Sequence, residues 1–267
     1  ELLWPQYLDE TKVAELEAEM GSLRAAGQLQ QRPVPLGGQI FHAEWFEIVE
    51  AAPAAMQRVR YWDNAGSDGK GAYSAGVRMG LSPEGTVYVE NVVRAQVSAA
   101  GRLQLQKTTA AIDADETGNT CEVWAEQEPG SAGKDVASIF IKQLRGYPVF
   151  VQRPTGDKVT RAMPLAAQAE AGNVKLVRGK WNRAYIDELI SFPNGKYKDQ
   201  VDGSSGAYNR LVAPGRPALL VDDLLCSGEP EDRQPLSDEE VAELPEFLRG
   251  LVESARQTAD ERDDDGW

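Results

Sequence analysis

The chain has 267 residues, 28 of them Lys or Arg and 42 Asp or Glu, so its net charge is −14 at pH 7. The length allows one large domain with extensions, and a hydrophobic content of 42% excludes a chain that is disordered throughout. Two cysteines and one histidine exclude a disulfide-rich scaffold and a Cys/His zinc site, so any acid–base or metal chemistry rests mainly on carboxylates.

The charge is distributed unevenly and indicates three segments. Residues 1–57 carry a net charge of −6, residues 58–213 carry +3 and residues 214–267 carry −11. We interpret them as an N-terminal helical linker from a preceding domain, a folded central domain, and an acidic C-terminal extension that is partly disordered. The central domain permits a polyanionic partner, and the acidic extension serves solubility, docking or mimicry of DNA. No apolar run reaches 18 residues, so no membrane span and no membrane partner are expected.

The first part of the chain is predicted to contain two helices and a meander. Apolar residues three and four apart predict a helix over residues 10–25, and a short helical stretch is predicted around residues 46–56. Three strand-like runs joined by short turns then predict an antiparallel meander over residues 58–62, 73–79 and 86–96.

Helices and strands alternate after the meander. Helices are predicted over residues 108–115, 134–145, 158–171, 181–192 and 200–212, and strands over residues 121–125, 148–152 and 174–177. A further helix is predicted over residues 244–257. This order is typical of an α/β fold in which a mixed sheet, begun by three antiparallel meander strands, carries helices on both faces.

Three acidic residues stand at the ends of predicted elements. Asp63 ends the first meander strand, Glu126 follows the strand 121–125, and Asp202 lies in the first turn of the last core helix. Each has an ordinary explanation by itself: a turn residue, a loop charge, or an acid that favours a helix N-terminus. Together, and in this order of elements, they can converge at one edge of a sheet.

Carboxylates that converge in this way are the ligands that hard cations such as Mg²⁺ and Mn²⁺ prefer. Two such ions about 3.5–4 Å apart activate a water on one side of a phosphodiester and stabilise the departing oxygen on the other. This chemistry requires no histidine. The three carboxylates therefore match two-metal phosphodiester hydrolysis, a class of chemistry that the composition leaves open, and Asp63, Glu126 and Asp202 are its candidate catalytic residues.

Four separated motifs resemble one known family, the nuclease domain of tailed-bacteriophage terminase large subunits, which are DNA-packaging motors. They are Y-W-D-N-A at 61–65, E-Q-E-P-G-S-A-G-K at 126–134, R-P-T-G-D-K at 153–158, and F-P-N-G leading to D-Q-V-D at 192–202. The motifs occur in the family order, and the resemblance covers roughly residues 30–213. It implies an RNase H-like, RuvC-like fold and a metal-dependent endonuclease that cleaves concatemeric double-stranded DNA during genome packaging.

The resemblance also implies roles for residues and partners. Asp63, Glu126 and Asp202 would be ligands of two Mg²⁺ or Mn²⁺ ions, and Asp199, one helical turn before Asp202, would be a further ligand or would support the ligands. The expected partners are double-stranded DNA, the packaging ATPase domain, the small terminase subunit and the portal, in the host cytoplasm. The chain lacks the G-x-x-x-x-G-K-[ST] motif, so we expect it to be the C-terminal portion of a longer motor, without the ATPase domain.

Four basic residues are candidate contacts for the DNA backbone. Lys134 follows a glycine-rich helix entry, and Arg153, Lys158 and Arg161 lie between a strand end and a helix start. The alternatives are that Ser131 simply caps the helix and that the other basic residues are solvated surface charge.

Two rival functions remain open. One is a different RNase H-like nuclease of the resolvase or transposase type, which the motifs at 153–158 and 192–202 disfavour. The other is a module that docks DNA or the portal and cuts nothing. This rival would gain if the three carboxylates lay too far apart to share a metal.

Overall fold

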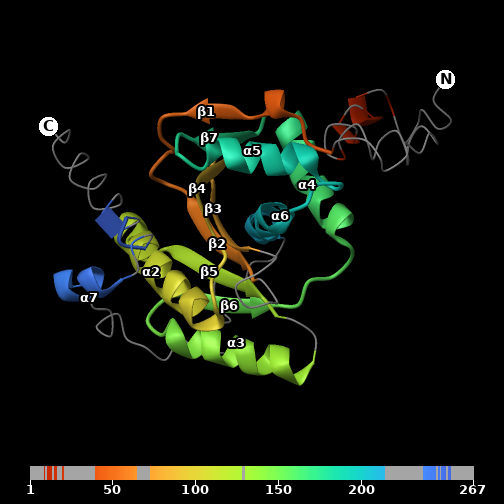
Figure 1. Cartoon of the computed structure of the whole chain (residues 1–267). Helices are drawn as coiled ribbons and strands as arrows, with labels where there is room; N and C mark the ends of the chain where they lie inside the picture. Colours follow the sequence, from red (N-terminus) through yellow and green to blue (C-terminus); the bar gives the residue numbers. More distant parts are fainter. Residues whose placement is uncertain are drawn as a thin grey trace, which may run out of the picture. The chain divides into compact units, whose positions relative to one another are not determined.

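The computed structural model (Figure 1) describes residues 40–64, 73–127, 130–213 and 237–244, together with residues 9, 11–13, 15–16, 20, 246, 248–250 and 252–253. The chain forms two compact units. The first comprises residues 1–65, 72–95 and 154–214, and the second comprises residues 66–71, 96–153 and 215–267.

The first unit contains a mixed sheet whose strand order is β1-β7-β4-β3-β2. The strands are β1 (Glu47–Val49), β2 (Gln57–Asp63), β3 (Ser74–Leu81), β4 (Val87–Ala95) and β7 (Val174–Val177). Strands β2, β3 and β4 pair antiparallel, whereas β7 pairs parallel with both β4 and β1. The predicted meander and the mixed sheet of an α/β fold are thereby confirmed.

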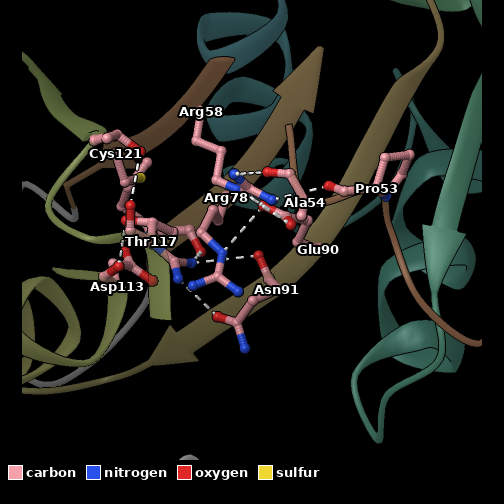
Figure 2. A network of polar contacts seen from close by, with 12 residues as sticks. Pro53, Ala54, Arg58, Arg78, Glu90, Asn91, Asp113, Thr117 and Cys121 are labelled. Carbon is pink, nitrogen blue, oxygen red and sulfur yellow. Dashed lines mark hydrogen bonds and ion pairs between the residues drawn. The ribbon is translucent and has the colours of Figure 1, made fainter. Parts of the chain in front are cut away.

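A network of arginines holds the three meander strands together (Figure 2). A bulge in the pairing of β3 with β4 places Glu90 and Asn91 together opposite Arg78. Glu90 binds the Nε atoms of Arg58, at 3.0 Å, and Arg78, at 3.4 Å. Arg60, only 1% exposed, donates to the Asn91 side chain at 2.9 Å. These arginines are therefore part of the fold and are not free to contact a polyanion.

Helix α6 (Asp199–Leu211) packs on β2 and β3 at close range because its sheet-facing residues are small. A Cβ atom added to Gly206 would lie 2.2 Å from the ring of Tyr61, and one added to Gly203 would lie 3.1 Å from Val77. A larger residue at position 206 would push the helix away from the sheet. The approach of α6 to β2 thus depends on a glycine at the position that faces the ring of Tyr61.

Two further helices, α4 (Lys158–Glu170) and α5 (Asn182–Ser191), pack against α6. The buried hydroxyls of Ser204 and Ser205 donate to carbonyls one turn earlier, at 2.6 and 2.7 Å. The Tyr185 hydroxyl of α5 lies 2.8 Å from the Ser204 hydroxyl. The buried hydroxyls of Ser204 and Ser205 are therefore hydrogen-bonded, as burial requires.

The second unit contains the helices α2 (Ala99–Thr117) and α3 (Ser131–Gln143) and the parallel strands β5 (Cys121–Glu126) and β6 (Val149–Gln152). Helix α2 packs against β5, and α3 packs against α2 and β6. The strand–helix–strand order of β5, α3 and β6 is the usual connection between parallel neighbours. Trp124 of β5 stacks on Phe150 of β6, with ring centroids 4.7 Å apart.

One predicted element is wrong. Residues 46–56 form no helix; a short 3-10 helix, η1 (Ala43–Trp45), precedes strand β1. Ile48 and Val49 are β-branched and pair with β7, which satisfies their backbone groups. Pro53 would clash with the carbonyl four residues earlier in a helix. Both effects favour an extended chain.

The remaining elements predicted between residues 58 and 212 are confirmed, with ends that differ by a few residues except at α2. Helix α2 begins well before the predicted residue 108 because Ser98 accepts a hydrogen bond from the Gly101 amide at 3.2 Å. It ends at Gly118, whose φ of 62° is left-handed.

Outside these elements only part of the prediction can be compared. The described residues within 10–25 are helical, and so are those within 246–253 and helix α7 (Asp238–Glu243). The tail from residue 254 onward lies outside the described residues. No helix in the described part of the chain is long and apolar enough to cross a membrane.

The packing of α6 predicts that its two glycines respond differently to alanine. Gly206→Ala would force the helix away from Tyr61 and should destabilise the protein by about 1–3 kcal/mol. In Gly203→Ala the new Cβ has one tight contact, with Val77 at 3.1 Å, and two ordinary contacts at 3.6 Å, and alanine gains helix propensity, so the stability should change by less than about 1 kcal/mol. Urea unfolding of both variants measures the difference, and equal midpoints would contradict this packing.

Candidate functional site

Asp63 and Asp202 come from two elements of the first unit, β2 and α6, that pack on each other. Asp63 is the last residue of β2 and is half-buried, and Asp202 lies in the first turn of α6 and is 1% exposed. A Cβ atom added to Gly203, the residue after Asp202, would lie 3.6 Å from the carbonyl oxygens of both Ala75 and Tyr61. The contact between α6 and β2 therefore carries Asp202 to the end of the strand that bears Asp63.

Asp202 is held by two cations from the first turn of α4. Lys158 Nζ donates to Asp202 Oδ2, and Arg161 donates to Oδ1 at 3.0 Å. The side chain of Arg161 is 15% exposed, whereas that of Lys158 is 54% exposed. A buried carboxylate requires such compensation because its charge is poorly solvated.

The Lys158 ammonium responds to both carboxylates. Burial alone would lower the pKa of Lys158, but the hydrogen bond to Asp202 and the charges of Asp202 and Asp63 raise that pKa above its ordinary value. The ammonium therefore carries a full positive charge at neutral pH. It lies where both carboxylates attract a cation.

Asp199 precedes Asp202 by one helical turn and is held by a different contact. It is 9% exposed, and its Oδ2 accepts a hydrogen bond from the backbone amide of Tyr73 at 3.2 Å. The two acids occupy the first turn of α6, where the helix dipole favours negative charge.

A buried ion pair that no sequence pattern marks fixes the start of α6. Glu188 of α5 accepts hydrogen bonds from the backbone amide and the side-chain amide of Gln200, each at 2.6 Å. Arg94, at the end of β4, lies 3.3 Å from Glu188. Glu188 thereby supplies a hydrogen-bond acceptor to the first turn of α6, which has no side-chain cap of its own.

Two tyrosines complete this support. The Arg94 guanidinium lies over the rings of Tyr73, at 3.7 Å, and Tyr197, at 4.8 Å. The two rings meet edge to face with centroids 5.0 Å apart. Tyr73 is also the residue whose amide binds Asp199, so the cluster links β4, α5 and the acidic turn of α6. Neither Arg94 nor Glu188 stands in a pattern that marks it in the sequence, because their partners are distant along the chain.

The other predicted site residues belong to the second unit or to the chain that leaves it. Glu126 is the last residue of β5, one residue beyond the predicted end of that strand, and is half-buried opposite Gln152 of β6. Lys134 is exposed in the first turn of α3, and Arg153 is exposed after β6. Helix α3 begins at Ser131 after Gly130, whose φ of 95° favours glycine, so Ser131 is not the N-cap.

The donor set of the first unit fits a hard divalent cation. Asp63 and Asp202 supply carboxylate oxygens, and the Lys158 ammonium on Asp202 stands where such a cation would be attracted. Within the described part of the chain, no group of three or more His, Cys, Asp or Glu side chains is arranged to hold a metal ion. The structure thus brings Asp63 and Asp202 close to a common cation but describes no complete ligand set.

Comparisons with known proteins agree with the fold. Residues 60–211 match a family model described as the terminase RNaseH-like domain. No curated protein matches the chain.

Several solved structures are similar in fold. A large terminase from a thermophilic bacteriophage, in complex with ADP, is 10% identical with a TM-score of 0.57; the match covers 78% of this chain and 53% of that one. The P22 large terminase nuclease domain is 14% identical with a TM-score of 0.47, covering 66% and 94%. The nuclease of phage G20c with bound magnesium is 15% identical with a TM-score of 0.48, covering 66% and 99%. This chain thus spans about half of the terminase that was solved with ADP.

The burial of Glu188 predicts a pH-dependent contribution to stability. Burial raises the pKa of Glu188 above the ordinary 4.5, although the hydrogen bonds from Gln200 and the charge of Arg94 oppose the shift. The folded state therefore binds this proton more tightly than the unfolded chain does. Its contribution to stability is complete below pH 4.5 and is lost as the pH rises through the raised pKa.

Glu188→Gln provides the comparison because glutamine does not titrate. The free energy of unfolding of the wild-type protein minus that of Glu188→Gln should fall as the pH is raised from 4.5 towards neutrality. Urea unfolding of both proteins at a series of pH values measures this difference. A difference that grows with pH would show that the folded state instead favours the charged carboxylate.

Proposed function

The chain belongs to the family of terminase RNaseH-like domains, and from this premise we propose that it is a metal-dependent endonuclease that cleaves double-stranded DNA during genome packaging. The observation that carries the proposal is the nearly complete burial of Asp202 beside the end of β2, where Asp63 stands. Carboxylate oxygens are ligands that hard divalent cations prefer, and Lys158 and Arg161 already bring positive charge to the Asp202 carboxylate.

Asp63, Glu126 and Asp202 are proposed as the metal ligands and catalytic residues, with Asp199 as a further ligand or a support. When bound, two Mg²⁺ or Mn²⁺ ions would activate the attacking water and stabilise the departing oxygen of a phosphodiester. Arg161 orients Asp202 through its bond to Oδ1. Glu188 fixes the backbone two residues before Asp202 through its bond to Gln200. The protein thereby fixes the positions of its carboxylates before any substrate binds.

The DNA backbone is proposed to contact Lys134, Arg153, Lys158 and Arg161. Lys134 and Arg153 are exposed and available to phosphates. Lys158 and Arg161 pair with Asp202. Their positive charges therefore lie beside the carboxylates, where they would attract the negatively charged scissile phosphate. Contacts of this kind add affinity without reading the base sequence.

The family also supports a place for this chain in a larger machine. We propose that it works beside a packaging ATPase domain, together with the small terminase subunit and the portal, in the cytoplasm of the host. The similar large terminase whose structure contains ADP is about twice as long as its match to this chain.

One rival retains a specific observation in its favour. The described residues include no group of three or more potential metal ligands, which would suit a module that docks DNA or the portal without cutting it. A resolvase or transposase has no comparable support, because the matched family is that of terminases. A cleavage assay separates nuclease from docking module.

The proposal predicts that the 267-residue chain linearises plasmid DNA with Mg²⁺ or Mn²⁺ and is inactive with a chelator. Asp63→Ala, Glu126→Gln and Asp202→Asn should each lower the cleavage rate at least about 100-fold, because each removes a metal ligand worth several kcal/mol of transition-state stabilisation. Asp199→Asn should have a milder effect if Asp199 only supports the ligands.

Asp187→Asn is the matched control because Asp187 is an exposed acid on α5 of the same unit, and it should cleave at the wild-type rate. Circular dichroism establishes that each variant is folded. Cleavage by Asp63→Ala at the wild-type rate would contradict the proposed role of this residue. Metal-independent binding of DNA without any cleavage would favour the docking module.

A further inference from the structure

Lys158 stands at a position in its helix that is unfavourable for a cation, and its bond to Asp202 offsets this effect. It is the first residue of α4, where the helix dipole disfavours positive charge. Arg161 is three residues later, on the same side of the helix. Both side chains reach Asp202, one to each oxygen. The first turn of α4 therefore supplies two positive charges to one buried carboxylate.

The two cations differ in how firmly they are held. The Arg161 side chain is 15% exposed, and the Arg161 carbonyl accepts a hydrogen bond from Asn209 of α6 at 3.1 Å. The Lys158 side chain is 54% exposed and reaches Asp202 from solvent on a flexible stem. A guanidinium binds carboxylate in a fixed geometry, whereas an ammonium acts as a mobile point charge. Lys158 is thus the partner that can leave Asp202.

The charges of two carboxylates and two cations at the site balance without a metal. Asp63 and Asp202 contribute two negative charges, and Lys158 and Arg161 contribute two positive charges. A divalent cation that bound Asp202 Oδ2 would lie next to the Lys158 ammonium, and the two like charges would repel each other strongly in this partly buried place. The divalent cation and the Lys158 ammonium therefore cannot both bind Asp202 Oδ2.

We propose that Lys158 and a divalent cation compete for Asp202: the ammonium neutralises the carboxylate in the metal-free protein and is displaced when the ion binds. This inference rests on the proposed function, since it takes Asp202 as a metal ligand. Lys158 then acts as a built-in competitor that lowers metal affinity while keeping the metal-free site stable. Once displaced, its ammonium stands at the exposed side of the carboxylates with its donors free for a phosphate.

The test compares Mn²⁺ binding by the 267-residue wild-type protein and by Lys158→Met, measured by isothermal titration calorimetry and by electron paramagnetic resonance of free Mn²⁺. Methionine keeps most of the stem and removes the competing charge, so Lys158→Met should bind Mn²⁺ at least about tenfold more tightly. The rise in melting temperature on adding Mn²⁺ should also be larger for Lys158→Met than for the wild type, because tighter binding stabilises the folded state more.

Two further variants keep the test independent of folding defects. Lys158→Arg retains the charge and should bind Mn²⁺ no more tightly than the wild type. Lys180→Met removes an exposed lysine just before α5 and should leave Mn²⁺ binding unchanged. The proposed competition would be overturned if Lys158→Met bound Mn²⁺ with the wild-type affinity. It would also be overturned if Lys158→Met and Lys158→Arg changed the Mn²⁺ affinity equally. A wild-type protein that binds no Mn²⁺ at all would overturn the proposed function together with it.

Discussion

The close approach of α6 to strands β2 and β3 is the constraint on which the candidate site depends. Gly206 leaves room for the ring of Tyr61, and the helix can therefore lie directly on the sheet. This contact buries Asp202 almost completely at the end of β2. A buried carboxylate needs compensation for its lost solvation, and Lys158 and Arg161 of α4 provide it for Asp202. The packing of one helix thus determines where the charge lies and which side chains must neutralise it.

A second layer keeps this arrangement rigid. Glu188 binds the first turn of α6, Arg94 binds Glu188, and the Arg94 guanidinium lies over the rings of two tyrosines. These contacts hold the backbone that carries Asp199 and Asp202 and leave their carboxylates in place without a substrate. For a reaction that depends on electrostatic stabilisation, such preorganisation is the protein's main contribution. The meander arginines serve a similar structural purpose by bridging β2, β3 and β4 through Glu90 and Asn91.

Local patterns predicted the meander, most of the helices and the position of Asp63 at a strand end, because period and turn residues are encoded nearby in the chain. The helix predicted after Phe46 is wrong. Ile48 and Val49 pair with β7 instead, and this pairing depends on residues more than 120 positions away. The contacts of Lys158 and Arg161 with Asp202 span 44 and 41 residues. The sequence marks each of these three residues as a candidate site residue. It predicts that Lys158 and Arg161 contact the DNA backbone, but not that they pair with Asp202.

Anomalous diffraction from crystals of this chain soaked in Mn²⁺ would show whether Asp63 and Asp202 bind a divalent metal. We expect anomalous peaks within coordination distance of the carboxylate oxygens of Asp63 and Asp202, with two ions about 3.5–4 Å apart if both sites fill. We also expect Lys158 to move away from Asp202 when Mn²⁺ is bound. Manganese peaks elsewhere on the protein, with Asp202 still bonded to Lys158, would show that Asp63 and Asp202 do not bind the metal.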